Sequence, residues 1–282
     1  MTEAAGTDRH SGIILEPGRA ERHYWRDLWY YRELFAILAW RDVSVRYKQT
    51  VIGVAWAVIR PFLTMVVFTI VFGRLAKLPS AGDAPYPIMV FGGMLPWFLF
   101  STVLSDASNS LVTNASLVGK VYFPRIIIPS ATLVAALVDL AVNLAMLAGL
   151  MIWFGFWPTW RILFLPLLVV AASLASLGPS LLMAALTVKY RDFRYIVPFV
   201  VQFGLYISPV GFTSAVVPDK WRLWYSLNPM VGTIDGFRWC LLGANSPLNL
   251  SGLLIGTGAI VFFLWVGIIY FRAAESRFAD VI

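Results

Sequence analysis

The chain has 282 residues, of which 59% are hydrophobic and only 13% are charged. Soluble domains carry about a quarter of their residues as charged ones, so this composition excludes an ordinary soluble protein. Aromatic side chains account for 15% of the chain, which also excludes intrinsic disorder. We therefore expect a protein whose solvent is the lipid bilayer.

Few residues are available for metal or nucleophile chemistry. The histidines, His10 and His23, lie in the polar N-terminal part, and Cys240 is the single cysteine. A zinc site, an intrachain disulfide and a catalytic Cys–His pair are therefore not expected. The chain also has no GxxxxGK[ST] phosphate-binding loop, so we expect no ATP hydrolysis, no metal and no cofactor in this chain.

Residues 1–50 form a mixed-charge segment, and its first 30 residues contain no apolar run longer than residues 13–15. This pattern predicts a cytoplasmic tail rather than a cleavable signal peptide. Within the tail, residues 24–39 have the spacing of an amphipathic helix that lies at the cytoplasmic membrane interface. The expected apolar face consists of Trp25, Leu28, Tyr31, Phe35 and Leu38.

Six apolar stretches follow, each close to the about 20 residues that a helix needs to cross the hydrocarbon core. They predict an all-α polytopic membrane protein with a single transmembrane domain over residues 51–272 and a short cytoplasmic C-terminus over residues 273–282. The expected spans are residues 51–72, 88–104, 126–154, 163–188, 195–212 and 250–271.

The distribution of Lys and Arg predicts the orientation. With the N-terminus in the cytoplasm, fifteen of the 22 basic residues fall on the cytoplasmic side and six on the other, and Arg60 lies inside the first span. Because cytoplasmic loops carry the excess of Lys and Arg, we expect both ends of the chain in the cytoplasm. Residues 221–242 are too short and too interrupted to cross twice, so we expect a re-entrant or interfacial helix pair between the fifth and sixth spans.

Five short motifs carry a resemblance to a known family. They are RYKQTVIG at residues 46–53 with the following Trp56 and Pro61, KVYFPR at residues 120–125, Arg191-Asp192, SPV at residues 208–210, and NPM at residues 228–230. In this order, within residues 30–275, they resemble the membrane subunits of type-two ABC exporters for O-antigen, capsular and teichoic acid polymers.

The resemblance implies a half-transporter in the inner membrane of a bacterium. It implies a homodimer that binds two copies of a separate nucleotide-binding subunit, on which ATP and Mg would be held. It also implies that a lipid-linked polysaccharide moves through a channel at the dimer interface. A lipid or drug efflux permease of the same architecture stays an alternative.

Short cytoplasmic elements would then contact the ATPase and transmit its conformational change to the membrane helices. Besides the amphipathic helix, we expect two loops to do so, because exposed aromatic residues flanked by Arg suit a protein interface. The expected coupling residues are Lys120, Tyr122, Phe123, Arg125, Arg191 and Asp192. The alternatives are that the basic residues only set the orientation, beside an interfacial aromatic belt, and that the last two residues pair locally.

A channel for a sugar polymer needs a surface that binds weakly and repeatedly, and aromatic faces let sugar rings slide. One aromatic stripe in the fifth span has i, i+4, i+7 spacing, and the second span holds another aromatic group. The expected channel residues are Trp97, Phe98, Phe100, Phe199, Phe203 and Tyr206. Lipid contact or helix packing is the alternative role.

Charged residues inside the spans are costly, at about 2.5 to 3.5 kcal/mol near the bilayer centre. Arg60 either extends to the inner surface or faces a cavity, where it would contact the diphosphate headgroup of a lipid-linked substrate. Asp139 and Asn143 share a helical face, which favours a helix-packing pair over a site. If Asp139 relays protons instead, the protein would be an ion-coupled secondary transporter, although the chain shows no internal repeat.

The re-entrant pair corresponds to the small helices that, by the resemblance, close the extracytoplasmic mouth. Within it, Asp235 and Arg238 are three residues apart on one helical face, and we expect them to pair in a structural role. The expected gate residues are Trp221, Trp224, Asn228, Pro229, Asp235 and Arg238. A membrane-embedded enzyme is disfavoured because the histidines are confined to the tail.

Overall fold

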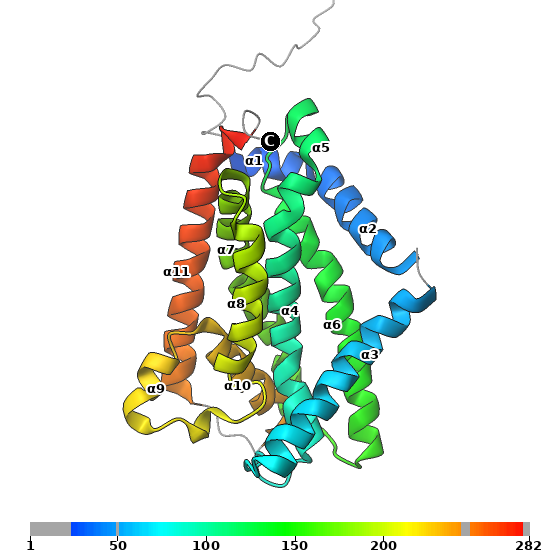
Figure 1. Ribbon diagram of the computed structural model, residues 1–282, viewed down its shortest axis with the longest axis vertical. Coiled ribbons are helices and arrows are strands. Elements are labelled where there is room, and N and C mark those ends of the chain that lie inside the picture. The colour runs from blue at the N-terminus through cyan, green and yellow to red at the C-terminus, as the bar shows by residue number, and fades with distance from the viewer. Residues whose placement is uncertain (1–23, 49–50, 244–248, 279–282) are drawn as a thin grey trace, which may run out of the picture.

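The computed structural model describes residues 24–48, 51–243 and 249–278, and every regular element within these ranges is a helix (Figure 1). This confirms the all-α class. The α-helices are α1 (Tyr24–Tyr30), α2 (Arg32–Lys48), α3 (Val51–Phe68), α4 (Tyr86–Thr113), α5 (Ala115–Lys120), α6 (Ile127–Trp153), α7 (Leu165–Lys189), α8 (Phe193–Ile207), α9 (Asp219–Tyr225), α10 (Pro229–Leu242) and α11 (Leu250–Glu275). A π-helical turn, η2 (Thr69–Leu75), extends α3, and two 3₁₀ turns, η3 (Trp160–Phe164) and η4 (Ser214–Val216), precede α7 and α9.

Long apolar helices dominate the described chain. Five stretches are long and apolar enough to cross a membrane, and they correspond to the first, second, third, fourth and sixth expected spans. They are Ala55–Leu75, Tyr86–Thr113, Ile127–Trp153, Trp160–Lys189 and Leu250–Glu275.

The fifth expected span is shorter in the structure than the sequence suggests. Helix α8 has 15 residues, which extend about 22 Å, less than the about 30 Å of a hydrocarbon core. The helix ends because Ser208, with ψ of 150°, is extended, as a residue before proline prefers to be. The structure thus supports a polytopic membrane protein in which α8 is a shorter, sixth apolar helix.

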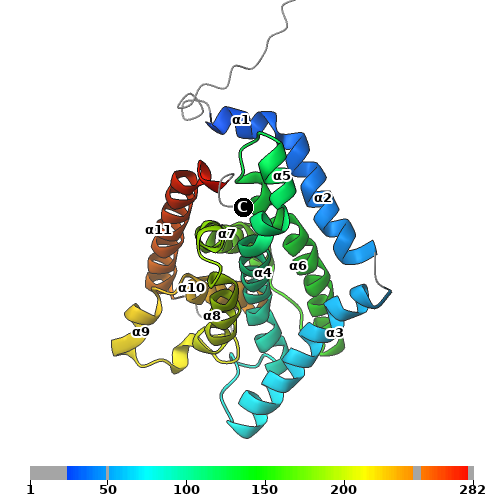
Figure 2. The same cartoon turned by 45° about the horizontal axis from the view of Figure 1, so that its top comes forward.

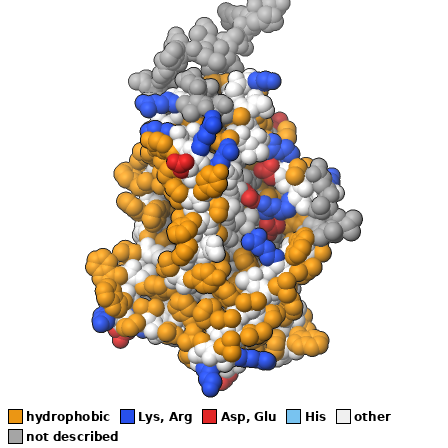
Figure 3. Space-filling model, viewed as in Figure 1, with side chains coloured by type: hydrophobic (Ala, Val, Ile, Leu, Met, Phe, Trp, Pro, Cys, Tyr) orange, Lys and Arg blue, Asp and Glu red, His pale blue; other side chains and the backbone are white. Residues whose placement is uncertain are grey.

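The long helices run between two ends of the molecule (Figure 1). Helices α1 and α5 and the C-terminal end of α11 lie at one end, here called the α1 end, and α9 and α10 lie at the other, the α9 end (Figure 1). Apolar side chains cover most of the face between the two ends (Figure 3). The described ends of the chain therefore lie together, as the expected orientation requires, and the assignment of the α1 end to the cytoplasm stays a prediction.

Helix α4 forms the centre of the bundle. Ile88, Met89, Val90, Phe91, Met94 and Leu95 are all fully buried. The helix packs against α6, α7, α8 and α10, and Figure 2 shows it between α6, α7 and α8. Residues 88–97 are all buried, so this part of α4 is enclosed by other helices on every face.

Helices α7 and α11 approach each other closely through glycine. A Cβ atom added at Gly267 would lie 2.2 Å from the carbonyl oxygen of Gly178, and one added at Gly178 would lie 2.6 Å from the backbone nitrogen of Leu264. Small residues permit such backbone contact between membrane helices, where van der Waals packing and interhelical hydrogen bonds drive association.

The N-terminal helix differs from the expected single amphipathic helix. The chain bends at Tyr31, so that α1 and α2 are separate elements (Figure 2). Four of the five residues of the expected apolar face pack in one apolar cluster, namely Leu28, Tyr31, Phe35 and Leu38. Trp25 does not: it points outward at 59% exposure, and Tyr24 is buried in its place at 8%. Helix α2 packs against α6.

Candidate functional site

An ionic cluster joins α2 to two of the long helices. The guanidinium of Arg46 in α2 forms ion pairs with Asp106 of α4 and Asp139 of α6, and the Tyr47 hydroxyl donates to Asp139. These four residues are called the Arg46 cluster. All three charged side chains are partly buried. An unpaired carboxylate on a membrane helix is costly, and here one arginine pairs with an acid on each of two helices.

The pKa values of the two α2 residues follow from this arrangement. Burial alone lowers the pKa of Arg46, but the two carboxylates outweigh burial and leave the pKa above its ordinary value. The pKa of Tyr47 is raised, first by burial and then by its hydrogen bond to the Asp139 carboxylate. The cluster therefore holds a charged arginine and a neutral tyrosine.

Asp139 and Asn143 do not form the side-chain pair that their spacing favours. The Asn143 amide nitrogen donates to the backbone carbonyl of Asp139 at 2.9 Å, while the Asp139 carboxylate accepts from α2. The expected side-chain hydrogen bond between Asp139 and Asn143 is therefore wrong. The reason is that a charged, multidentate guanidinium from α2 binds a carboxylate more strongly than a neutral amide does.

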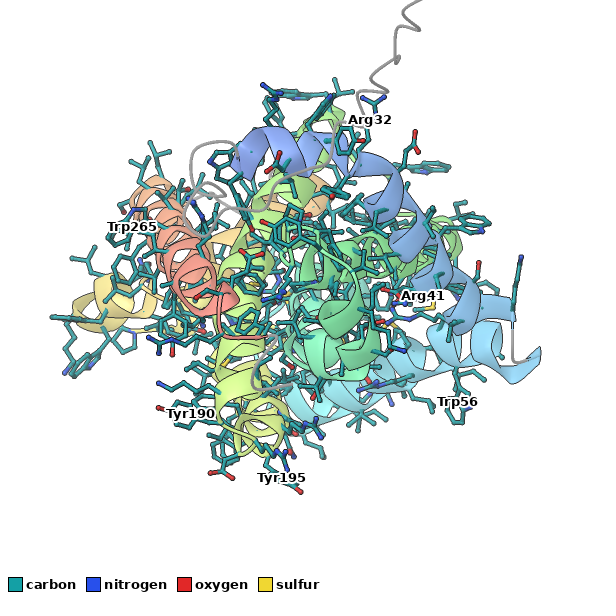
Figure 4. The ribbon with its side chains drawn as sticks, turned by 90° about the horizontal axis from the view of Figure 1, so that it is seen from above. Arg32, Arg41, Trp56, Tyr190, Tyr195 and Trp265 are labelled. Atoms are coloured by element: carbon teal, nitrogen blue, oxygen red, sulfur yellow. The ribbon has the colours of Figure 1, made fainter. Side chains whose placement is uncertain are left out.

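A polar cavity lies beside the cluster. It has a volume of about 370 Å³ and is lined by α2, α3, α4, α6 and one residue of α8. Its polar lining residues are Arg46, Arg60, Ser101, Thr102, Ser105, Asp106, Asp139 and Asn143. Acidic and basic side chains also interrupt the apolar surface beside α2 and α3 in Figure 3, and the view from above labels Trp56, which lines the cavity, on this side of the bundle (Figure 4).

Arg60 lies on the wall of this cavity, and its contact with a substrate headgroup stays a prediction. The side chain is exposed, and among the described residues no carboxylate lies within ion-pair distance of it. Its helix, α3, contains Pro61. The cavity thus combines an ionic cluster of two carboxylates and one guanidinium with one further cation.

The expected channel residues fall into two groups. Phe199, Phe203 and Tyr206 are 58%, 50% and 58% exposed, and the rings of the first two stack at 4.2 Å. They form an outward-facing aromatic stripe on α8, here called the α8 stripe.

The α4 aromatic residues do not share that exposure. Trp97 and Phe100 are buried at 3% and 8%, and Phe98 is half-buried on the cavity wall. The indole of Trp97 fills the space beside Gly204 of α8, where an added Cβ would lie 2.6 Å from it. Trp97 and Phe100 therefore pack helices together within the chain, because a large ring against a glycine closes the gap between α4 and α8.

Arg238 is the most deeply buried charge in the described chain, at 1% exposure. It donates to the carbonyl oxygens of Phe212 at 2.6 Å, Val210 at 2.7 Å and Met89 at 3.3 Å. The expected ion pair with Asp235 is therefore wrong. The carbonyls of the irregular segment after α8 lack helical partners, so they bind the guanidinium instead.

A sequence profile of the ABC-2 type transporter family matches residues 33–242. The chain belongs to the ABC-2 type transporter family. The resemblance that the five motifs carry is thereby confirmed. Together with the long apolar helices, membership makes this ABC-2 permease a multi-pass protein of the inner membrane.

Curated relatives cover nearly the whole permease. It is 26% identical over 261 residues to the O-antigen export system permease protein RfbA of Myxococcus xanthus, which covers 91% of this chain and 98% of the relative. The RfbA protein of Klebsiella pneumoniae is 24% identical over 260 residues, with 91% and 97% covered. The polysialic acid transport protein KpsM of Escherichia coli is 21% identical over 243 residues, with 84% and 91% covered.

The first expected coupling loop of the permease is partly buried. Lys120 and Tyr122 are exposed, but Phe123 is only 3% exposed and packs among apolar residues of the α1 end. Arg125 is bound to the end of α11: its backbone N–H donates to Glu275 Oε1 at 2.6 Å, and its guanidinium donates to the Glu275 carbonyl. Of the four residues, two face outward and two hold the loop in place.

A second cavity of about 710 Å³ adjoins this loop, between α1 and the end of α11. The Arg272 guanidinium lies 4.6 Å from the centre of the Tyr24 ring on its wall. The pKa of Tyr24 is raised, first by burial and then by the negative charge of Glu275.

The second expected coupling loop joins α7 to α8. Arg191 and Asp192 are both exposed, and the structure shows no ion pair between them. The neighbouring Tyr190 and Tyr195 point away from the bundle (Figure 4). Local pairing is therefore not their role in this structure.

The expected gate residues lie at the α9 end. Trp221 and Trp224 of α9 are 57% and 69% exposed. Asn228 begins α10: its side chain accepts from the Met230 N–H at 3.0 Å and donates to Ser208 Oγ at 3.0 Å. Pro229 is the buried first residue of α10. The permease thus has a short exposed helix beside a buried one, anchored to the segment after α8.

Sequence reasoning did not assign a role to Arg46, Tyr47 or Asp106, although the first two lie in a motif that carries the family resemblance. The available signal was Asp139 inside one apolar span and Asp106 just after another, because an acid at such a position requires a partner.

Proposed function

We propose that the protein is the transmembrane subunit of an ATP-driven exporter that moves a lipid-linked polysaccharide across the inner membrane. The observation that carries this proposal is the match to relatives named for O-antigen export and polysialic acid transport over most of both chains. The energy would come from two copies of a separate nucleotide-binding subunit, on which ATP and Mg are held. The permease would act as a homodimer, with the channel at the dimer interface.

The exposed faces of the permease support this arrangement. The α8 stripe presents three aromatic side chains outward, and we assign channel lining to Phe199, Phe203 and Tyr206. Trp97 and Phe100 of α4 are buried and contribute through packing. Aromatic faces bind sugar rings without fixed register, which suits a polymer that must slide.

The α1 end would receive the ATPase. Lys120, Tyr122, Arg191 and Asp192 are exposed there, while Phe123 and Arg125 hold the first loop against α11. Exposed aromatic and charged residues on short loops beside a rigid helix end suit a docked partner. At the α9 end, α9 and α10 would close the extracytoplasmic mouth as the re-entrant pair.

An ion-coupled transporter is disfavoured by the structure, whereas export of a lipid or drug is left to experiment. The Asp139 carboxylate is bound by Arg46 and Tyr47, which disfavours a freely titrating proton relay and therefore an ion-coupled transporter. A lipid or drug exporter of the same architecture would differ from the proposed polysaccharide exporter only in its substrate.

The test is affinity purification of the tagged permease from native membranes in mild detergent, combined with surface glycan analysis of a deletion strain. We expect a phosphate-loop ATPase at one copy per permease chain and loss of a surface polysaccharide on deletion. A stable chain without an ATPase would overturn the ATP-driven mechanism, and an unchanged surface glycan would overturn the substrate.

A further inference from the structure

The cavity between α1 and the end of α11, here called the α11 cavity, has a volume of about 710 Å³, which is in the range of small-molecule sites. Its wall has two parts. Ile268 and Ile269 of α11, with Phe123 and Pro124 of the loop after α5, form an apolar part. Charged side chains of α1, of the same loop and of the last turn of α11 form a polar part. The α11 cavity therefore suits a molecule with a polar head and an apolar body.

The last turn of α11 lies at the level of lipid headgroups. The helix has 26 residues, which extend about 39 Å, whereas the hydrocarbon core of a bilayer is about 30 Å thick. Both ends of α11 therefore reach the headgroup region, even at the average helix tilt of about 20°.

An exposed apolar stripe leads from the cavity along α11. Ile269, on the cavity wall, is 49% exposed. Trp265 and Val261 precede it by four and eight residues, so they share its helical face, and each is 61% exposed. Trp265 points away from the bundle (Figure 4). The apolar part of the cavity is thus continuous with a surface that lipid chains can contact.

Four charged side chains line the polar part, and two of them bind each other. The Arg125 guanidinium donates to the Glu275 carbonyl, and the Glu275 carboxylate accepts from the Arg125 backbone N–H. The other two are Arg272 and Asp27. Within the described ranges neither of them forms an ion pair, and they do not pair with each other. Among the described residues, the α11 cavity therefore offers one cation and one anion without partners.

Arg272 is held in position while its hydrogen-bond donors stay available. Its guanidinium lies over the Tyr24 ring, 4.6 Å from the ring centre, and Tyr24 is buried. A guanidinium over a ring keeps the N–H groups at its edge for other acceptors. Such a group binds two oxygens of a phosphate in a fork-like geometry.

The two unpaired charges select a zwitterionic headgroup. A phosphodiester would bind Arg272, and a primary ammonium would donate to the Asp27 carboxylate. Phosphatidylethanolamine carries both groups on one apolar body. Phosphatidylglycerol supplies only the phosphate and places a second negative charge beside Asp27, while the trimethylammonium group of phosphatidylcholine has no N–H to donate.

We propose that the α11 cavity binds a molecule of phosphatidylethanolamine, with its phosphate at Arg272, its ammonium at Asp27 and its chains on the exposed face of α11. Because Asp27 belongs to α1 and Arg272 to α11, the bound headgroup bridges the two helices. The inference is independent of the substrate that the permease exports.

The test measures lipid binding to the full-length permease by native mass spectrometry, after detergent exchange that removes co-purified lipid. The probes are dioleoyl phosphatidylethanolamine, dioleoyl phosphatidylcholine and dioleoyl phosphatidylglycerol, which differ only in the headgroup. We expect the ethanolamine lipid to bind at least about fivefold more tightly than the other two, as one additional hydrogen bond provides.

Two variants separate the two ends of the headgroup. Arg272→Gln should weaken the binding of all three lipids, because each carries the phosphate. Asp27→Asn should remove the preference for the ethanolamine lipid and strengthen the binding of the glycerol lipid, because a negative charge beside the phosphate is lost. Asp27→Asn is expected to fold, since it breaks no ion pair among the described residues.

Matched controls are Arg277→Gln and Glu33→Gln. Both side chains are exposed and lie outside the cavity lining, so all three affinities should equal those of the wild type. The controls separate the site from general attraction between lipid headgroups and charges at the α1 end.

Three results would overturn the inference. The first is equal affinity for the three lipids, and the second is equal affinity of wild type and Arg272→Gln. The third is loss of the co-purified ATPase from Arg272→Gln or Asp27→Asn with unchanged lipid binding, which would assign the cavity to the ATPase instead. Absence of an ATPase from the wild type, or an unchanged surface glycan on deletion, would overturn the proposed function without changing these lipid affinities.

Discussion

The guanidinium of Arg46 in α2 forms an ion pair with the carboxylate of Asp139 in α6, 93 residues further along the chain. The same guanidinium also binds Asp106 of α4. Helix α2 is thus attached by charge to two helices of the bundle, one of which is its centre. A displacement of α2 would be transmitted to α4 and α6 through this contact.

Replacement of Arg46 by Ala should destabilise the permease. The change leaves two carboxylates without their cation on membrane helices, so we expect a loss of about 1–3 kcal/mol in the free energy of unfolding. This is less than the about 3–5 kcal/mol of a fully buried pair, because solvent reaches the cluster. Thermal unfolding in detergent measures it. Arg32→Ala is the control, because Arg32 belongs to the same helix but lies over the Trp29 ring, outside the Arg46 cluster. An equal fall in Tm for both variants would contradict the prediction.

The structure separates two neighbouring residues of the first coupling loop. Tyr122 is 54% exposed, whereas Phe123 is 3% exposed. We expect Tyr122→Ala to leave the amount and the Tm of the permease unchanged while ATP hydrolysis by the complex continues with reduced export. Phe123→Ala should instead cost about 3–5 kcal/mol of stability, as loss of a buried ring does. Full export by Tyr122→Ala would remove that residue from coupling.

The helices were predictable because their determinants are local. Apolar runs of sufficient length predicted five of the long stretches. The second was expected to end at residue 104, whereas α4 continues to Thr113, and α8 ends before its expected limit at residue 212. Its end at Ser208 depends on the conformation before Pro209, which hydropathy does not report. The bend at Tyr31 was missed for the same reason: the spacing of apolar residues across the bend resembles one continuous helix.

The ionic contacts were not predictable because they join distant parts of the chain. Asp106 and Asp139 needed a cation, but the sequence offers 22 basic residues and no rule that selects Arg46. Arg238 was assigned to Asp235 by helical spacing, yet its partners are backbone carbonyls. Gly93, where a Cβ would lie 2.6 Å from Arg238 Nη2, provides the space for that side chain.

Tyr24 should give the permease an alkaline sensitivity. Its pKa is raised above the ordinary value by burial and by Glu275, so the folded state resists deprotonation more than the unfolded state does. The resulting stability is fully present below about pH 10, the unfolded pKa, and is lost as the pH rises towards the folded pKa. Tyr24→Phe should lose less Tm than wild type between about pH 9 and 11. An identical loss for both proteins would contradict the assignment.

The α8 stripe should be needed for export and not for folding. The triple change of Phe199, Phe203 and Tyr206 to Ala removes exposed rings only, so we expect normal permease levels with reduced surface polysaccharide. Phe262→Ala is a matched control, since Phe262 is 57% exposed on α11. Quantitative glycan immunoblotting compares the strains. A normal glycan level in the triple variant would assign the stripe to lipid contact.

A single methyl group at Gly267 should separate α7 from α11. The added Cβ would lie 2.2 Å from the Gly178 carbonyl oxygen. Neither atom can rotate away, because the Cβ is attached directly to the α11 backbone and the oxygen belongs to the α7 backbone. Overpacking of this kind costs about 1–3 kcal/mol, so we expect Gly267→Ala to lower the Tm in detergent. Gly258→Ala in the same helix meets nothing within 4 Å and should leave the Tm unchanged or raise it slightly, because alanine favours the helix. If the two variants unfold at the same temperature, the close α7–α11 contact does not exist in the folded permease.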